Sequence, residues 1–264
     1  MRTPFLLVIL AGVGAGTFLH AQEKPAIQPA TAPAYALTLT QEQVNAEIKK
    51  WDGSVETYFV TTTSQPTSTQ SSANIPQGPF VRVKFNTPNL SGAEQSKGIP
   101  DDALEPLKKL EQLDDLYLYN ASNLTRAGLE HLRGMTQLRM LYTVGSTDAT
   151  CAGLESLSGL KHLVFLSLVC SKVTDAGLVH VKGLTQIGHL KLDYSEVSDA
   201  GLEHLDGLNN LVILSLTHTK VTDAGLEHLK KLSHLQSLDL AGTKVTDDGL
   251  KKLQKALPKC KITH

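Results

Sequence analysis

A six-residue phrase returns through the second half of the chain at a nearly constant interval. It reads VTDAGL at 173–178, VSDAGL at 197–202, VTDAGL at 221–226 and VTDDGL at 245–250, after the divergent copies LTRAGL at 124–129 and ATCAGL at 149–154 and a fainter copy ending at Leu104. The glycines shared by the six copies are 25, 24, 24, 24 and 24 residues apart. A fixed period of this length is the sequence signature of a solenoid, in which each repeat stacks on its neighbours.

Each repeat divides into a short helix followed by a short strand. In a representative copy, Thr174 stands where it can cap the helix, and Asp175 falls in the first turn, where its charge faces the positive end of the helix dipole. Leu178 is placed on the inner helical face, and Leu190 and Leu192 alternate in the strand. Both elements therefore bury apolar side chains between them.

The spacings of the two layers predict the architecture. Neighbouring strands lie about 4.8 Å apart, whereas packed helices need about 8–10 Å. Stacking such repeats should curve the array, with the strands on the inner side. We therefore expect an α/β fold: a curved solenoid with a parallel concave sheet, convex helices and a small N-terminal cap.

The N-terminus has the composition of an exported protein. Residues 1–21 carry Arg2 and then an uncharged, mostly apolar run from Phe5 to Leu19. This run is shorter than the about 20 apolar residues of a membrane-spanning helix, so a cleaved signal peptide is favoured over a retained anchor. Residues 22–39 are rich in Ala and Pro and are expected to form a disordered tether.

The remaining chain divides into a cap and the repeats. Residues 40–97 are expected to cover the apolar edge of the first repeat with a helix that starts at Thr40, strands at 55–60 and 80–85, and a mobile Ser/Thr-rich loop. Terminal repeats of solenoids are atypical for this reason. Residues 98–264 hold the repeats and a C-terminal cap.

The pattern LxxLxLxxT…VTDAGLxxL resembles that of leucine-rich repeat proteins, specifically the bacterial type with 24-residue VTDAGL repeats. Its helical convex side is similar to that of ribonuclease-inhibitor-like and cysteine-containing repeats. The resemblance covers residues 98–264 and implies a non-catalytic recognition or scaffold role. No recognisable F-box precedes the repeats, so the function of the ubiquitin-ligase relatives is not carried over.

Histidines and aspartates recur in the repeats and could suggest chemistry. Equivalent histidines of neighbouring repeats should be separated by about 8–10 Å, whereas zinc–nitrogen bonds are about 2.0–2.1 Å, so a shared metal ion is not expected. The recurring aspartates are explained by capping, without a catalytic triad. These residues are His131, His180, His204 and His228, and Asp175, Asp199 and Asp223.

Two further observations argue against an enzyme. The chain has no GxSxG, HExxH, P-loop or dinucleotide-binding motif. Its three cysteines, Cys151, Cys170 and Cys260, are an odd number without a CxxC motif, which favours free thiols over a disulfide framework or a zinc site. We therefore expect no catalysis, no cofactor and no metal.

The outward positions of the strands carry the strongest functional signal. Four of the six tyrosines of the chain fall in this band. Aromatic residues on a rigid, solvent-facing sheet resemble binding hot spots, although they also favour strands for packing alone. The predicted partner-binding residues of the concave face are Tyr117, Tyr119, Tyr142, Phe165, His189, Lys191, Asp193, Tyr194 and His218.

Charge helps to define the class of partner. The 25 basic and 26 acidic residues give a formal net charge of −1, which suggests neither nucleic acid nor an anionic membrane. The sequence thus predicts an exported module, periplasmic, cell-envelope or extracellular, that binds a protein or peptide. The alternatives are a carbohydrate-binding module and a structural envelope spacer, which would contact the membrane only if the N-terminal segment is retained.

Overall fold

The computed structural model of the chain describes residues 39–49, 53–59, 79–85, 98–110, 112–145, 153–169 and 172–264. All of them belong to one compact unit, Leu37–His264. The predicted export signal, nearly all of the predicted tether, the loop at 61–78, Cys151 and Cys170 lie outside the described residues.

Short helical segments and strands alternate along the described chain. In chain order they are α1 (Leu39–Ile48), β1 (Gly53–Phe59), β2 (Pro79–Phe85), η3 (Asp101–Lys109), β3 (Asp115–Leu118), α2 (Arg126–Glu130), β4 (Met140–Val144), η4 (Leu154–Leu157), β5 (Phe165–Val169), α4 (Asp175–Leu178), β6 (His189–Lys191), α5 (Asp199–Leu202), η5 (Glu203–Leu205), β7 (Ile213–Ser215), α6 (Leu226–Leu229), β8 (Ser237–Asp239), α7 (Asp247–Ala256) and β9 (Lys261–Thr263). The three η segments are 3-10 helices.

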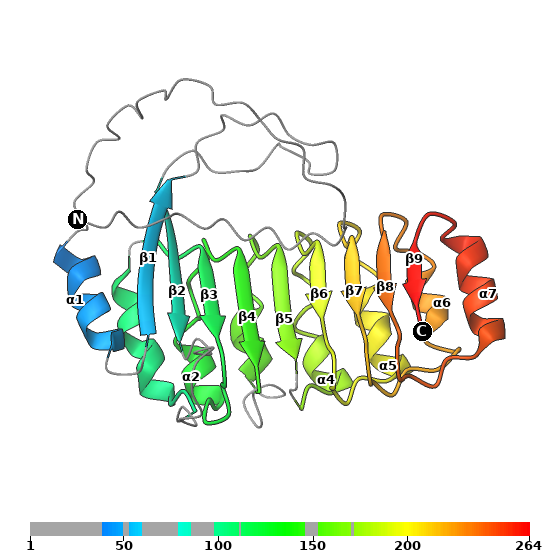
Figure 1. The fold of residues 1–264 in the computed structure, drawn as a ribbon, viewed down its shortest axis with the longest axis horizontal. Helices are drawn as coiled ribbons and strands as arrows, with labels where there is room; N and C mark the ends of the chain where they lie inside the picture. Colours follow the sequence, from blue (N-terminus) through cyan, green and yellow to red (C-terminus); the bar gives the residue numbers. More distant parts are fainter. Residues whose placement is uncertain are drawn as a thin grey trace, which may run out of the picture. The chain divides into compact units, whose positions relative to one another are not determined.

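The nine strands form one sheet in the order of the sequence (Figure 1). β1 is antiparallel to β2, and the eight strands from β2 to β9 are parallel. The helical segments of the repeats lie on one face of this sheet. The predicted α/β solenoid with a parallel sheet is confirmed, and its curvature stays a prediction. We call the face opposite the helices the open face.

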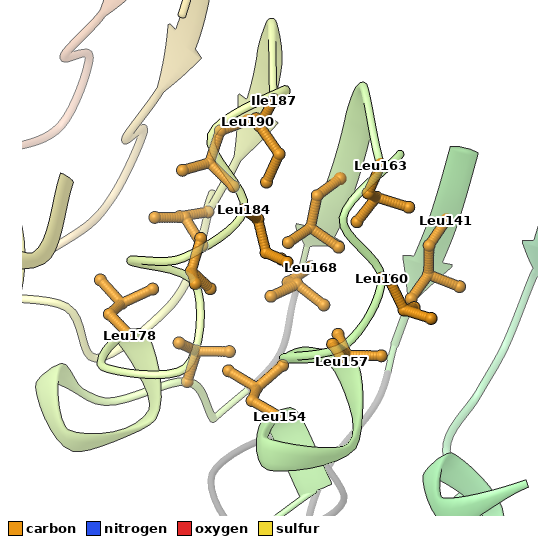
Figure 2. Close-up of a cluster of buried hydrophobic side chains, with 14 of the residues drawn as sticks. Leu141, Leu154, Leu157, Leu160, Leu163, Leu168, Leu178, Leu184, Ile187 and Leu190 are labelled. Atoms are coloured by element: carbon orange, nitrogen blue, oxygen red, sulfur yellow. The ribbon is translucent and has the colours of Figure 1, made fainter. Parts of the chain in front are cut away.

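A continuous apolar core fills the space between the sheet and the helical segments. Strand residues such as Leu141 and Leu190 meet helical residues such as Leu157 and Leu178 there (Figure 2). The register places equivalent leucines directly beside one another, for example Leu166 beside Leu190. Each repeat therefore depends on its neighbours for burial, because a single repeat cannot cover its own leucines.

The N-terminal elements extend the sheet and the core. β1 and β2 correspond to the strands expected at 55–60 and 80–85, with shifted ends. Val44 and Ile48 of α1 are buried, and α1 contacts η3 and β1. The helix begins at Leu39. The helix therefore starts next to the expected position, and Thr40, expected as its capping residue, lies inside it.

The C-terminus closes the other end of the core. α7 ends at Ala256, two residues before Pro258, as a proline stop predicts. The chain then forms β9, a strand not expected from the sequence, which pairs in parallel with β8. Cys260 is buried and Ile262 packs against the core, so this segment shields the last repeat.

The repeated aspartate links neighbouring repeats. The two carboxylate oxygens of Asp175 accept hydrogen bonds from the backbone N–H and the hydroxyl of Ser198 in the next repeat, at 2.7 and 2.5 Å. We call this pair of bonds the aspartate clamp. The same clamp joins Asp101 to Thr125, Asp199 to Thr222 and Asp223 to Thr246.

This clamp adds a contact to the predicted capping role of the repeated Thr and Asp, which the structure shows in part: Asp175 lies in the first turn of its helix, and Thr125 caps its helix through the N–H of Ala127. Thr246 caps its own helix through the N–H of Gly249, but Thr174 and Ser198 make no side-chain capping bond. The clamp also explains the glycine of the phrase, because a Cβ on Gly201 would lie 2.4 Å from Oδ1 of Asp175. The letters T, D and G therefore encode one contact between repeats.

Candidate binding face

Five of the predicted site residues form a continuous row of rings on the open face. Their ring centroids are 5.4 Å apart between Tyr119 and Tyr142, 5.8 Å between Tyr117 and Tyr142, 6.4 Å between Tyr142 and Phe165, and 5.8 Å between Phe165 and His189. These separations suit favourable aromatic pairs. We call these five residues the aromatic ladder.

Strand register brings the ladder together. Tyr117 of β3 pairs directly with Tyr142 of β4, and Phe165 of β5 pairs with His189 of β6. Side chains alternate between the two faces of a strand, so Leu116 and its equivalents fill the core while the rings occupy the open face. The ladder rings are half-buried.

Two cations of β2 extend the ladder and were missed from the sequence. The guanidinium carbon of Arg82 lies 5.2 Å from the ring centroid of Tyr117, and Nζ of Lys84 lies 6.0 Å from it. Arg82 also forms an ion pair with Asp115 at 2.5 Å. The alternation of β2 already put both cations on one face, but only the parallel pairing with β3 shows that this is the face of Tyr117.

One position on the open face departs from the expected exposure. Ser167 lies on the open face of β5 but is fully buried between its register partners Tyr142 and Lys191. Its hydroxyl has no hydrogen-bond partner among the residues that the structure describes. Larger neighbours on both sides cover this small side chain.

His189 is the ladder residue whose charge depends on pH near neutrality. Burial lowers the pKa of His189, and the nearby Lys191 ammonium lowers it further. His189 is therefore neutral at neutral pH, because even its ordinary pKa is about 6.5. The positive charges beside the ladder come from Arg82, Lys84 and Lys191.

Tyr194 and His218 form a second aromatic group after the strands. Their rings stack with centroids 4.7 Å apart, and we call them the turn pair. Both have left-handed backbone conformations, with φ of 56° and 54°. Such values are uncommon for residues other than glycine. Gly242 takes the same position in the next repeat, with φ of 71°.

A carboxylate organises the strand ends near the turn pair. Asp193 accepts hydrogen bonds from the Ser215 hydroxyl and, at 3.0 Å, from the Thr217 N–H. The structure thus divides the nine predicted residues into the ladder, the turn pair, and the flanking Lys191 and Asp193. The binding role of all nine stays a prediction.

The residues considered for other chemistry make structural contacts. Asp175, Asp199 and Asp223 serve as clamps, and the bonds from Thr246 lower the pKa of Asp223. His228 bonds Asp206 at 3.3 Å, and burial raises the pKa of Cys260. No group of three metal-ligating side chains occurs among the described residues. None of the described helices is long and apolar enough to cross a lipid bilayer.

Comparison with known families supports the repeat assignment. The model of the family described as "Leucine Rich repeat" matches residues 207–230 and 231–253. No curated protein matches the chain. The family match falls on the most regular repeats, and the remaining repeats share their parallel strand register.

Three solved structures are among those to which the chain is similar. An internalin C2 from Listeria monocytogenes is 24% identical, with a TM-score of 0.49 over 63% of this chain and 66% of that one. A leucine-rich repeat protein from Leptospira interrogans is 18% identical, with a TM-score of 0.38 over 64% and 52%. An internalin from L. monocytogenes is 19% identical, with a TM-score of 0.39 over 63% and 64%. The chain spans between half and two thirds of these structures.

Proposed function

Because this chain is a leucine-rich repeat protein, we propose that it is an exported, non-catalytic module that holds a protein or peptide partner on its open face. The observation that carries the proposal is the aromatic ladder, five rings in mutual contact across four strands. Aromatic anchors held on a rigid surface dominate many protein interfaces. Export rests on the apolar run from Phe5 to Leu19.

The surroundings of the ladder define what a partner would offer. Arg82 and Lys84 lie beside Tyr117, and Lys191 lies beyond Ser167. Apolar side chains would pack on the rings, and acceptor groups would meet the flanking cations.

A pull-down from native envelope and secreted fractions tests the proposal. The bait is the full chain, compared with a triple variant of the ladder, Tyr117→Ala, Tyr142→Ala and Phe165→Ala. The matched control carries three substitutions of exposed residues on the helical side, Lys182→Ala, Glu203→Ala and Glu227→Ala. We expect a partner that the wild type and the control retain and the ladder variant loses.

Circular dichroism verifies that all three baits are folded. Equal recovery by the ladder variant would reject the open face as the site and leave the spacer function. Retention of a glycan by the wild type, with the same ladder dependence, would indicate the carbohydrate-binding alternative. N-terminal sequencing of the protein purified from its native envelope separates a cleaved signal from a retained anchor.

A further inference from the structure

A groove of about 670 Å³ lies at the N-terminal ends of strands β3 to β6. Its volume is typical of ligand-binding pockets, about 300–1,000 Å³. No residue of the aromatic ladder or the turn pair lines it. The lining residues are Gln112, Asp114, Gln137, Arg139, Lys161, His162, Val164, Thr185 and Gln186.

The repeat frame builds this groove from two rows of equivalent positions. Asp114, Arg139 and Val164 directly precede β3, β4 and β5, and their main chains are joined: Arg139 N–H donates to Asp114 O, and Val164 N–H donates to Arg139 O, both at 2.8 Å. The second row stands three residues before strands β3 to β6. It consists of Gln112, Gln137, His162 and Gln186.

The groove carries positive charge, and its one carboxylate is already engaged. Asp114 is 2% exposed and accepts hydrogen bonds from the N–H of Val81 at 2.9 Å and from Nε2 of Gln112 at 2.9 and 3.0 Å. The lining also holds two cationic side chains, Arg139 and Lys161, against this single carboxylate.

The contacts of the donors identify Arg139 as the free cation. Nζ of Lys161 donates to the carbonyl of Gly183 at 3.1 Å, and Nδ1 of His162 bonds the carbonyl of Thr136 at 2.8 Å. The Arg139 guanidinium forms no hydrogen bond or ion pair within the described part of the chain. A guanidinium offers two parallel N–H donors that match a carboxylate.

Neutral groups beside Arg139 suit a peptide. The side-chain amides of Gln137 and Gln186 also make no hydrogen bond within the described residues, and each offers both a donor and an acceptor. Val164 is 39% exposed in the same lining and supplies an apolar contact. Amides on either side of an arginine can bind the main chain of a peptide while the arginine binds its carboxylate.

We propose that this groove is a second binding site, which takes an acidic peptide with a carboxylate paired to Arg139 and its main chain bonded to Gln137 and Gln186. The carboxylate is that of an acidic side chain or of a free C-terminus. The site does not depend on the open face, so it can hold a second part of the same partner or a separate ligand.

Isothermal titration calorimetry on the full chain tests this site with four probes. They are the acetylated, amidated peptide Ala-Glu-Ala, its neutral counterpart Ala-Gln-Ala, acetylated trialanine with a free C-terminus, and inorganic phosphate. We expect binding of at least one carboxylate peptide, weakened by added salt, and no binding of the neutral peptide. Which of the two carboxylate peptides binds distinguishes the two sources of the group.

Matched arginine variants locate the site. Arg139→Gln should weaken the carboxylate peptide about tenfold or more through loss of a bidentate pair, and Arg139→Lys should weaken it less. Arg126→Gln is the control, because Arg126 has the same charge but pairs with Glu155 outside the groove. Gln186→Glu keeps Arg139 and should also weaken binding by adding a negative charge.

Equal affinity of wild type and Arg139→Gln would overturn the proposal, as would equal binding of the neutral peptide. An Arg139-dependent response to phosphate alone would overturn the carboxylate assignment. The ladder variant should bind the acidic peptide normally, so failure of this site and failure of the open face give different results. Circular dichroism confirms the fold of each variant.

Discussion

The molecule has upstream repeats, between residues 112 and 169, and downstream repeats, from residue 172 onward. The two regions share one parallel strand register, but different contacts join their neighbouring repeats. Downstream, the phrases at 173–178, 197–202 and 221–226 each contribute an aspartate to a clamp on the next repeat. Upstream, Arg126 and Cys151 occupy the aspartate position. Arg126 instead forms an exposed ion pair with Glu155 of the following repeat. At this link an exposed ion pair replaces the clamp, although Asp101 still forms a clamp with Thr125 at the start of the upstream repeats.

The two regions also differ in what they present to a partner. The upstream strands carry the tyrosines and Phe165 of the ladder, and the groove around Arg139 lies at their edge. At equivalent open-face positions the last two downstream strands carry Ile213, Ser215, Ser237 and Asp239, without an aromatic side chain. The tyrosines and Phe165 of the ladder and most of the groove lining therefore lie where the repeat departs most from its own consensus, while His189 and the turn pair belong to the regular repeats.

The largest expected loss of stability comes from adding a side chain at the glycine that lies against the aspartate clamp. Gly201→Ala places a Cβ 2.4 Å from Oδ1 of Asp175, which must displace a carboxylate holding two hydrogen bonds. We expect a loss of about 2–3 kcal/mol in the free energy of unfolding, measured by urea denaturation.

Gly159→Ala is the matched control, because a Cβ at Gly159 meets nothing within 4 Å. It should leave stability within about 0.5 kcal/mol of the wild type. If both alanine variants lost the same stability, the backbone flexibility of glycine, and not the clamp, would explain why glycine recurs in each copy of the phrase.

The next largest loss of stability is expected when a clamp is removed, and it can be compared with the loss from removing the Arg126–Glu155 ion pair. Asp199→Ala removes the acceptor for the N–H and hydroxyl of Thr222 and should cost about 2 kcal/mol. Arg126→Ala removes an exposed ion pair and should cost less than about 1 kcal/mol. Urea denaturation at low and high salt measures both. Equal losses would mean that the clamp contributes no more than a surface ion pair.

The sequence predicted the frame of this molecule better than its contacts. The period and the leucine alternation were sufficient for the parallel sheet and for the outward placement of Tyr117, Tyr142 and Phe165. The clamp was not predictable, because Asp175 and Ser198 are 23 residues apart and meet only once two repeats are stacked.

The same limit applies to the surfaces. Arg82 belongs to a strand expected only as part of a cap, and the register between β2 and β3 brings it to Tyr117. The groove around Arg139 combines positions from four repeats, each unremarkable by itself. Contacts between repeats depend on register, which a single sequence does not specify.

Acid should weaken the clamp between Asp223 and Thr246, with a smaller loss of stability than the substitutions above. Hydrogen bonds from the hydroxyl and N–H of Thr246 lower the pKa of Asp223. Below the unfolded pKa of about 3.9, the unfolded aspartate is protonated while the folded one is still ionised. The unfolded state then binds more protons, so this contribution to stability is present above that pH and is lost as pH falls through the folded pKa.

Urea denaturation of wild type and Asp223→Asn at pH 7 and pH 3 measures this effect. The acid-induced loss of stability should be smaller in the variant. Asp248→Asn is the control, because Asp248 is exposed and bonds only Lys251 of its own helix. A change in acid sensitivity that is the same for both variants would contradict a special role for the clamp.

The smallest effect is expected in the turn pair, where the downstream repeats are the irregular ones. Upstream, Asn120 and Gly145 hold the left-handed turn position, whereas Tyr194 holds it downstream with φ of 56°. Tyr194→Gly removes strain of about 1–2 kcal/mol and also a stack on His218 of about 0.5–1.5 kcal/mol. The two terms oppose each other, so thermal unfolding should change by less than about 1 kcal/mol. Tyr194→Ala loses the stack but keeps the strain and should be less stable than Tyr194→Gly. Equal stability of the two variants would show that the left-handed backbone is unstrained, and the turn pair would then lose the backbone strain that marks it as a functional feature.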